Sequence, residues 1–179
     1  PQAQIERRKG PARDYAFVVA RVSQADRAVT RAPSGGVRVA FFDLAQPAQL
    51  VAERIEPVIA FTGVPAFWGS APLEALRDKK FAIQWDGKLK IAQAGIYRFR
   101  VETWSGSAEL WLDGQLALKE PGRPHERTRS EASIHLRVGT HELRLRYTLL
   151  SGEFRGLKIR WIGPDGIEGV IPPSVFLPP

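Results

Sequence analysis

Residues 81–118 read FAIQWDGKLKIAQAGIYRFRVETWSGSAELWLDGQLAL, and this stretch decides the fold. Over residues 97–102, ring or aliphatic side chains alternate strictly with charged ones. Because a β-strand places successive side chains on opposite faces, one set is buried and the other faces water. The dipeptide Asp113-Gly114 is typical of a type I′ turn, in which both residues adopt positive φ. The stretch therefore predicts antiparallel strands and a tight hairpin.

The same period of two recurs along most of the chain. Apolar and polar side chains alternate at residues 37–41, 81–85, 134–138, 143–147 and 157–161. Many short strands, each with one buried face, favour two antiparallel sheets packed as a β-sandwich. No helical period of comparable strength occurs, although Leu73 and Leu76 favour about two helical turns over residues 72–80. We therefore predict an all-β antiparallel sandwich with at most short helices.

Short motifs that include these strands follow one another in a fixed order. They are found at residues 36–43, 67–72, 81–89, 95–99, 110–114, 156–161 and 170–176. In this order they resemble the protective antigen domain family, whose most recognisable signature is the leucine-tryptophan-x-aspartate-glycine motif. That module occurs in anthrax protective antigen, yeast flocculins, bacterial glycosidases and surface proteins. The resemblance implies a jelly-roll-like domain over residues 35–179, in an extracellular, periplasmic or cell-surface protein.

Length and composition agree with one domain and an extension. The 179 residues are enough to bury a sizeable core. The chain contains no Cys, which excludes a disulfide framework, a cysteine metal site and a cysteine nucleophile. It also contains no Met, so we expect a piece of a longer polypeptide. No apolar run approaches the ~20 residues that span a bilayer, so no transmembrane segment is expected in this chain.

Residues 1–34 fall outside the resemblance. They carry seven basic residues against three acids, and the start of the segment is typical of a flexible basic linker. Residues 14–31 are too apolar for a free linker and predict either a strand or a helix. The β-branched Val18, Val19 and Val22 favour the strand. We expect this arm to cap a sheet edge or to contact a neighbouring domain or protein.

The resemblance also raises the question of calcium. Lectin-like members hold Ca²⁺ with two consecutive aspartates just before the signature, because this cation prefers six to eight oxygen ligands. Here those positions are Ser105 and Gly106, and residues 103–108 contain no acid. The nearest acids, Glu102 and Glu109, belong to the strands on either side. We therefore expect neither calcium nor another metal at this loop.

The same loop is the expected ligand site. An exposed indole offers an apolar face and an N–H to a sugar ring, which makes Trp104 a candidate. The predicted ligand-binding residues are Trp104, Ser105, Gly106 and Ser107. Alternation places Trp85 and Trp161 in the core, and the resemblance implies a structural role for Trp111.

No pattern of catalytic residues emerges. A glycosidase needs two carboxylates that flank a cleft, and Glu102 and Glu109 are the nearest pair. Acids on a hydrated strand face are the more common explanation. The three histidines, His125, His135 and His141, match no metal or triad spacing and are expected on the surface. We predict no catalytic residues and no enzyme.

Charge is the remaining signal. The formal net charge is +7 and the isoelectric point is near 10.1. Basic side chains that alternate outward on the strands are Arg98, Arg100, Arg144, Arg146, Lys158 and Arg160. Such a surface attracts polyanions. Pairing with glutamates across strands is the favoured interpretation, and no nucleic-acid partner is expected.

Together these observations predict a non-catalytic module of a larger exported or membrane-anchored protein. Its expected partner is a glycan or another cell-envelope component, bound without calcium. The alternative is a structural or protein-interaction module, such as a spacer or an assembly contact. A polyanion-binding domain and a glycosidase-associated enzyme domain are the less favoured interpretations.

Overall fold

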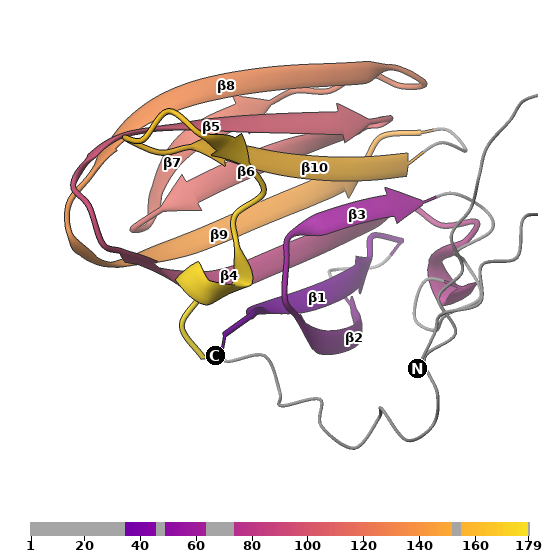
Figure 1. The fold of residues 1–179 in the computed structure, drawn as a ribbon. Helices are drawn as coiled ribbons and strands as arrows, with labels where there is room; N and C mark the ends of the chain where they lie inside the picture. Colours follow the sequence, from indigo (N-terminus) through magenta and orange to yellow (C-terminus); the bar gives the residue numbers. More distant parts are fainter. Residues whose placement is uncertain (1–34, 46–48, 64–73, 152–154, 179) are drawn as a thin grey trace, which may run out of the picture. The chain divides into compact units, whose positions relative to one another are not determined.

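A computed structural model describes residues 35–45, 49–63, 74–151 and 155–178, and these are mostly β-strand (Figure 1). Every strand pair is antiparallel. The first sheet has six strands, in the order β2 (Gln49–Glu56), β1 (Val37–Asp43), β4 (Phe81–Ile91), β9 (Gly139–Leu149), β6 (Gly106–Leu112) and β7 (Gln115–Glu120).

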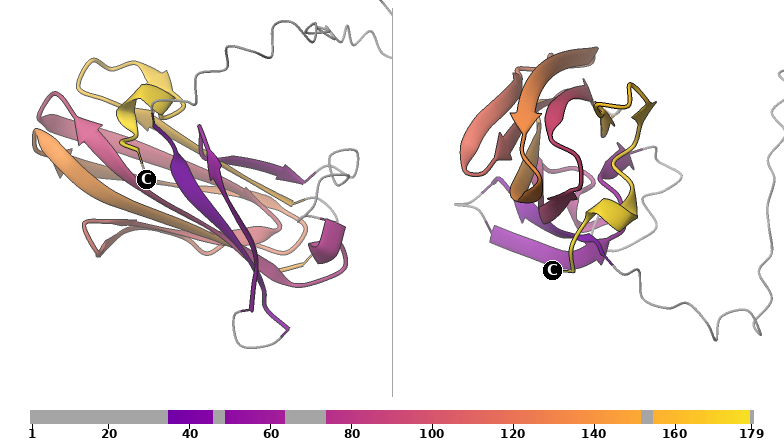
Figure 2. Two further views of the ribbon diagram at one scale, coloured as in Figure 1. Left: turned by 90° about the horizontal axis from the view of Figure 1, so that it is seen from below. Right: turned by 60° about the vertical axis from the view of Figure 1, so that its left-hand side comes forward.

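The second sheet has five strands. Its strands are β11 (Glu168–Gly169), β10 (Arg155–Ile162), β5 (Gly95–Trp104) and β8 (Arg127–Leu136), and β3 (Ala60–Gly63) also pairs with β10. We call it the five-stranded sheet. The views in Figure 2 show its strands lying alongside those of the six-stranded sheet as a second layer. The prediction of an all-β antiparallel sandwich is confirmed.

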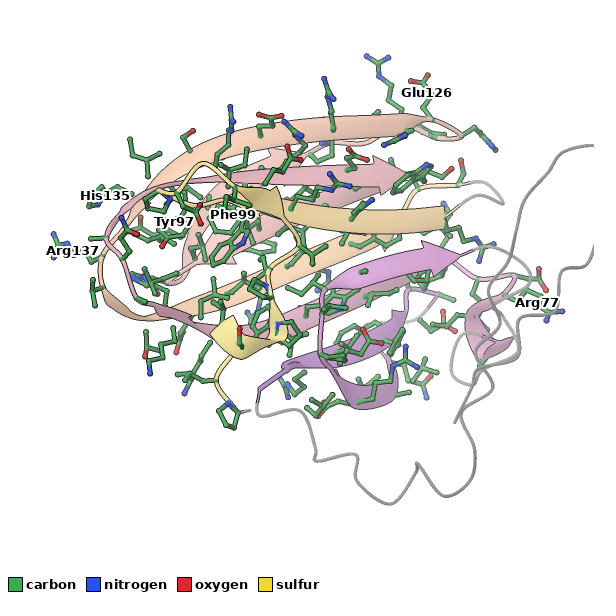
Figure 3. All side chains as sticks on the ribbon, viewed as in Figure 1. Arg77, Tyr97, Phe99, Glu126, His135 and Arg137 are labelled. Carbon is green, nitrogen blue, oxygen red and sulfur yellow. The ribbon has the colours of Figure 1, made fainter. Side chains whose placement is uncertain are left out.

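The core lies between the two sheets. The six-stranded sheet contributes Phe41, Trp85 and Tyr147, each no more than 2% exposed. The five-stranded sheet contributes Phe99 and Ile159, which are equally buried, and Figure 3 shows the Phe99 ring between the layers. Burial of this apolar surface is the main favourable term in folding. The charged half of each alternating strand is left on an outer face.

Helical structure among the described residues is limited to two 3₁₀ turns, η3 (Glu74–Leu76) and η4 (Pro173–Val175). The helix expected at residues 72–80 is therefore too long, although residues 72 and 73 lie outside the described part. Within the described part of that segment, Leu76 is fully buried. Beyond η3, Lys79 Nζ lies 2.6 Å from Asp43 Oδ2 and connects this segment to β1.

At the sheet margins, the sequence analysis missed one strand and placed one residue wrongly. Strand β2 was not predicted, because it is an edge strand with mostly exposed side chains. Val138 was assigned to the buried set of its strand, but it is 64% exposed. The alternation stops at Leu136, and the chain turns into β9 at Gly139, whose φ is +138°.

The predicted hairpin at Asp113-Gly114 is present between β6 and β7. Asp113 has φ +50° and Gly114 has φ +77°, as a type I′ turn requires. The extension at residues 1–34, with the predicted strand or helix at 14–31, lies outside the described residues. So does the tryptophan-containing motif at residues 67–72.

Candidate functional site

Trp104, the first candidate, is the last residue of β5 and is half-buried. The guanidinium of Arg127 lies over its ring, with Cζ 5.0 Å from the ring centroid. The indole also packs on β10, where a Cβ at Gly156 would lie only 3.0 Å from Trp104 Cε3. Arg127 is held in turn by an ion pair with Glu102. Neighbouring side chains therefore occupy much of the ring surface that a ligand would use.

Ser105 and Gly106 form the corner at which the chain crosses from the five-stranded to the six-stranded sheet. Ser105 is 1% exposed and has φ +52°. Its N–H donates to Glu126 O and its carbonyl accepts from Leu150 N, both at 2.9 Å. Gly106 is buried as well, because a Cβ there would overlap the ring of Tyr147. Only Trp104 and Ser107 of the four predicted residues have exposed side-chain surface.

A buried carboxylate holds the neighbouring loop in place. Glu120 is 3% exposed; its Oε1 accepts from Gly122 N at 2.8 Å and its Oε2 accepts from Ser130 Oγ at 2.7 Å. Its oxygens are therefore committed to the protein. The described residues hold no group of three or more His or acidic side chains placed to share an ion. The absence of a calcium site stays a prediction for a binding experiment.

The outer face of the five-stranded sheet carries an ionic network. Arg100 Nε lies 2.5 Å from Glu131 and its Nη1 lies 2.7 Å from Glu168, which also contacts Arg160 at 3.4 Å. The hydrogen bond from Arg100 holds the pKa of Glu131 below its usual range. The predicted pairing of arginine with glutamate across strands is confirmed here. Of the other expected basic residues on this face, Arg98 and Lys158 make no ion pair within 4.0 Å among the described residues, although the charge of Arg98 contributes to the lowered pKa of Glu131.

The predicted basic residues do not form one surface. Arg98, Arg100, Lys158 and Arg160 lie on the outer face of the five-stranded sheet, which contains β5 and β10. Arg144 and Arg146 lie on β9, in the other sheet, and point away from the core there. The two sets therefore face opposite sides of the sandwich.

The outer face of the six-stranded sheet is hollowed into a groove of about 690 Å³. Its centre is a row of four residues, each opposite the next in the strand register: Arg38 on β1, Asp86 on β4, Arg144 on β9 and Trp111 on β6. Gln84 and Arg146 form the next row on one side, and Lys88 and Glu142 the next on the other. We call this surface the Trp111 groove.

Asp86 is the electrostatic centre of the Trp111 groove. Its Oδ1 accepts from Arg144 Nε at 2.6 Å, and its Oδ2 accepts from Gln84 Nε2 at 2.8 Å and from Arg38 Nη2 at 3.3 Å. Burial raises the pKa of Asp86, but these hydrogen bonds and the two guanidinium charges outweigh it and leave the pKa lowered. Asp86 therefore stays ionised and keeps the groove side chains in position.

Trp111, for which the resemblance implied a structural role, lies on the outer face of the six-stranded sheet. It is half-buried on the outer face, because Leu110 and Leu112 on either side point into the core. Among the described residues no guanidinium lies over its ring, in contrast to Trp104. The signal was present in the sequence, since the alternation that buries the two leucines also places Trp111 outside.

A sequence profile of the PA14 domain, the protective antigen module, matches residues 36–174. The chain belongs to the PA14 domain family. The resemblance inferred from the motifs is thereby confirmed, and its extent differs from the match by only a few residues at either end. No curated protein sequence matched the chain.

Solved structures place this PA14 domain among relatives of the same fold. An anti-sigma factor domain-containing protein from Clostridium clariflavum matches with a TM-score of 0.65 and 27% identity, covering 82% of this chain and 49% of its own. A second protein of that description matches with 0.67 and 18%, covering 82% and 48%. The chain thus spans about half the length of both. A PA14 sugar-binding domain from an RTX adhesin matches with 0.63 and 17%, covering 81% and 99%.

PA14 domains are modules of the carbohydrate-binding type, and they occur in adhesins, in toxins and in glycosidases. In this PA14 domain the candidate acids Glu102 and Glu109 lie on opposite outer faces, where Arg127 and Lys119 pair with them. They do not flank a common cleft. None of the helices among the described residues has the length and apolar character needed to cross a bilayer.

The histidines occupy three different environments. Figure 3 shows His135 projecting outward at the end of β8. His125 lies in the loop before β8 and has φ +62°. His141 is half-buried, with Nδ1 2.7 Å from Asp113 Oδ2 and Nε2 2.9 Å from Arg137 O. The hydrogen bond to Asp113 raises the pKa of His141. Through its two hydrogen bonds, His141 at the start of β9 contacts both the Asp113-Gly114 hairpin and the turn between β8 and β9.

Proposed function

We propose that this PA14 domain is a non-catalytic glycan-binding module that holds its ligand in the Trp111 groove without calcium. The observation that carries the proposal is an indole without a covering cation beside three planar polar side chains, those of Gln84, Asp86 and Arg144. The groove volume lies within the ~300–1,000 Å³ typical of ligand sites.

The chemistry of the groove suits a sugar ring. A pyranose has an apolar face of C–H groups, which packs on an indole, and a rim of hydroxyls, which needs hydrogen-bond partners. Arginine supplies several donors in a fixed plane, and glutamine supplies both a donor and an acceptor. Arg144 uses Nε for Asp86, which leaves its two Nη groups to donate to a ligand. Trp111 and Arg144 lie opposite each other on neighbouring strands, so their Cα atoms are about 5 Å apart.

The lowered pKa of Asp86 supports a role in binding rather than in catalysis. A glycosidase needs a carboxylic acid whose pKa is raised, so that it can donate a proton. Asp86 has a lowered pKa and three hydrogen-bond donors on its oxygens. It therefore acts as a fixed anchor for Arg38 and Arg144. Ser105 and Gly106, in place of the aspartate pair, support recognition without calcium.

The setting of the module is part of the same proposal. The RTX adhesin domain is described as sugar-binding, and this chain covers 99% of it at the level of the fold. We place the domain in a larger exported or surface protein, outside the cell or in the periplasm. Residues 1–34 then join it to a neighbouring domain or protein.

A glycan array probed with the 179-residue chain in Ca²⁺ and in EDTA tests the proposal. We expect equal binding in both, and a loss of at least about tenfold in Trp111→Ala, because the variant loses the stacking surface. Trp104→Ala is the matched control and changes affinity less than about twofold. Binding that requires Ca²⁺, or that depends on Trp104 alone, would contradict the proposal. No binding to any glycan would favour the interaction or spacer module.

A further inference from the structure

The cations of the Trp111 groove are not fully neutralised. Four basic residues, Arg38, Lys88, Arg144 and Arg146, line the groove with only two carboxylates, Asp86 and Glu142. Asp86 binds Arg38 and Arg144, and Arg38 also pairs with Glu53 on β2 at 3.5 Å. Glu142 lies opposite Lys88 in the strand register, at one end. The excess positive charge is therefore concentrated at the other end, around Arg146.

Arg146 has no carboxylate partner among the described residues. Its guanidinium rests on the ring of Phe42, with Cζ 5.7 Å from the centroid. Its two neighbours in the register are Gln84 and Glu109, and Glu109 is bound by Lys119 at 3.0 Å. The guanidinium is thus positioned by an aromatic ring and remains available to an external anion.

A second set of donors lies next to it. Arg144 precedes Arg146 by two residues on the same face of β9, so their Cα atoms are about 7 Å apart. Arg144 is 55% exposed and contacts Asp86 only through Nε. Arg144, Arg146 and Trp111 all line the groove, with the Arg144 guanidinium turned toward Asp86 on β4 and that of Arg146 toward Phe42 on β1. Two planar forks that line one groove are suited to a carboxylate.

We infer that the groove selects sugars that carry a carboxylate, such as uronic acids, and this inference rests on the proposed glycan site. One sugar of an acidic oligosaccharide packs on Trp111, and a carboxylate of the same oligosaccharide is held by Arg144 and Arg146 farther along the groove. Glu142, at the far end, opposes the ligand charge and weakens binding. A glycan is favoured over single-stranded nucleic acid because the groove presents one indole, whereas strand binding stacks successive bases on several rings.

Matched probes separate the carboxylate from the sugar. Oligomers of galacturonate, glucuronate and mannuronate are each presented beside their methyl esters, which keep the ring and remove the charge. A sulfated galactan and oligothymidylate complete the set. We expect at least one acid to bind about tenfold or more tightly than its ester, because charge-assisted hydrogen bonds are about twice as strong as neutral ones.

Matched variants locate the effect. Arg146→Gln is expected to weaken binding of the acid about tenfold and to leave the ester within about twofold. Arg98→Gln is the control, since Arg98 also makes no ion pair within 4.0 Å among the described residues but lies on the other sheet, where it acts on Glu131 only at longer range. It carries the same change in net charge and should leave both ligands within about twofold. Glu142→Gln should strengthen binding of the acid about twofold.

Each alternative outcome has one meaning. Equal binding of acids and esters, both lost in Trp111→Ala, overturns the carboxylate inference and leaves the glycan function standing. No binding to any acid, ester or neutral glycan overturns the glycan function itself. Equal losses in Arg146→Gln and Arg98→Gln, stronger binding of the sulfated galactan, or equally tight binding of oligothymidylate would each show that the groove responds to charge alone, against the inference.

Discussion

On the outer face of the five-stranded sheet, Arg100 lies between two carboxylates, 2.5 Å from Glu131 and 2.7 Å from Glu168. On the outer face of the six-stranded sheet, Arg146 rests on the Phe42 ring and has no carboxylate partner among the described residues. Both arginines follow from the same alternating pattern. The residues opposite them in the neighbouring strands decide which one is neutralised and which one can bind a ligand.

The two outward tryptophans repeat this contrast. Trp104 has the guanidinium of Arg127 over its ring and the backbone of Gly156 beside it. Trp111 borders a groove instead, next to Arg144. The corner that follows Trp104 is packed as tightly as the core, whereas the surface around Trp111 is open. The comparison therefore favours a structural role for the first region and supports the proposed binding role of the second, and three measurements test that division.

The largest expected effect concerns the corner. Gly106→Ala should lower the free energy of unfolding by about 3 kcal/mol, because the new methyl group overlaps a Tyr147 ring that has little freedom to move. The Tyr147 hydroxyl donates to Trp104 O at 2.8 Å, and Phe61 and Phe81 pack on the same ring. Urea denaturation followed by tryptophan fluorescence measures the change.

Gly114→Ala is the control for Gly106→Ala. Gly114 also lacks a side chain, but no atom lies within 4 Å of its Cβ position, so only its φ of +77° opposes the substitution. The cost should be about 1 kcal/mol. If Gly106→Ala were as stable as the natural chain, the corner would be adaptable, and Ser105 and Gly106 could then become accessible to a ligand after all.

The second effect is a pH dependence of stability that comes from His141 and its contact with Asp113 in the hairpin. Protonated imidazole donates from both nitrogens, and both of its neighbours, Asp113 Oδ2 and Arg137 O, are acceptors. The pKa of His141 is therefore raised on folding, chiefly by the hydrogen bond to Asp113. The stabilisation is fully present below the unfolded pKa of about 6.5 and is lost as pH rises through the folded pKa.

Asp113 sets the lower limit of the same window. Burial raises its pKa, but hydrogen bonds from His141 and Glu142 N outweigh burial and lower it. Its contribution is present above an unfolded pKa of about 3.9 and is lost as pH falls through the folded value. Urea midpoints should decline as pH rises from the unfolded pKa of about 6.5 through the folded pKa of His141 and then level off, and His141→Gln should remove that decline. A decline that persists in His141→Gln would exclude this residue as its cause.

The strands were predictable because one side chain in two is buried, and this signal is local. It gave β4, β5, β9 and β10, together with the hairpin at Asp113-Gly114. It failed for β2, an edge strand in which Val51 and Ala52 pack against the core only partly. An edge strand has one neighbour and a solvated margin, so its sequence carries little periodic signal.

The Trp111 groove was not predictable from local patterns. Arg38, Asp86 and Arg144 are brought together only by the order and register of three strands, and Asp86 is 58 residues from Arg144 in sequence. Trp111 could have been placed outside from its leucine neighbours, but the family resemblance implied a structural role and was given more weight. The sequence analysis predicted that arginines such as Arg100 pair with glutamates across strands. It did not identify the partner Glu168, because this residue belongs to a two-residue strand without a recognisable pattern.

The smallest expected effect concerns the ionic network on the five-stranded sheet. Arg100 and Glu131 are partly exposed, at 24% and 34%, so solvent screens their attraction. Arg100→Gln should lower the urea midpoint only slightly, and a double-mutant cycle with Glu131→Gln should give a small coupling that shrinks at high salt. Glycan affinity should not change, because Arg100 lies on the face opposite the groove. A large coupling that is insensitive to salt would mean that this face is desolvated, as it would be under a covering partner, and the contrast between the two faces would then have to be drawn differently.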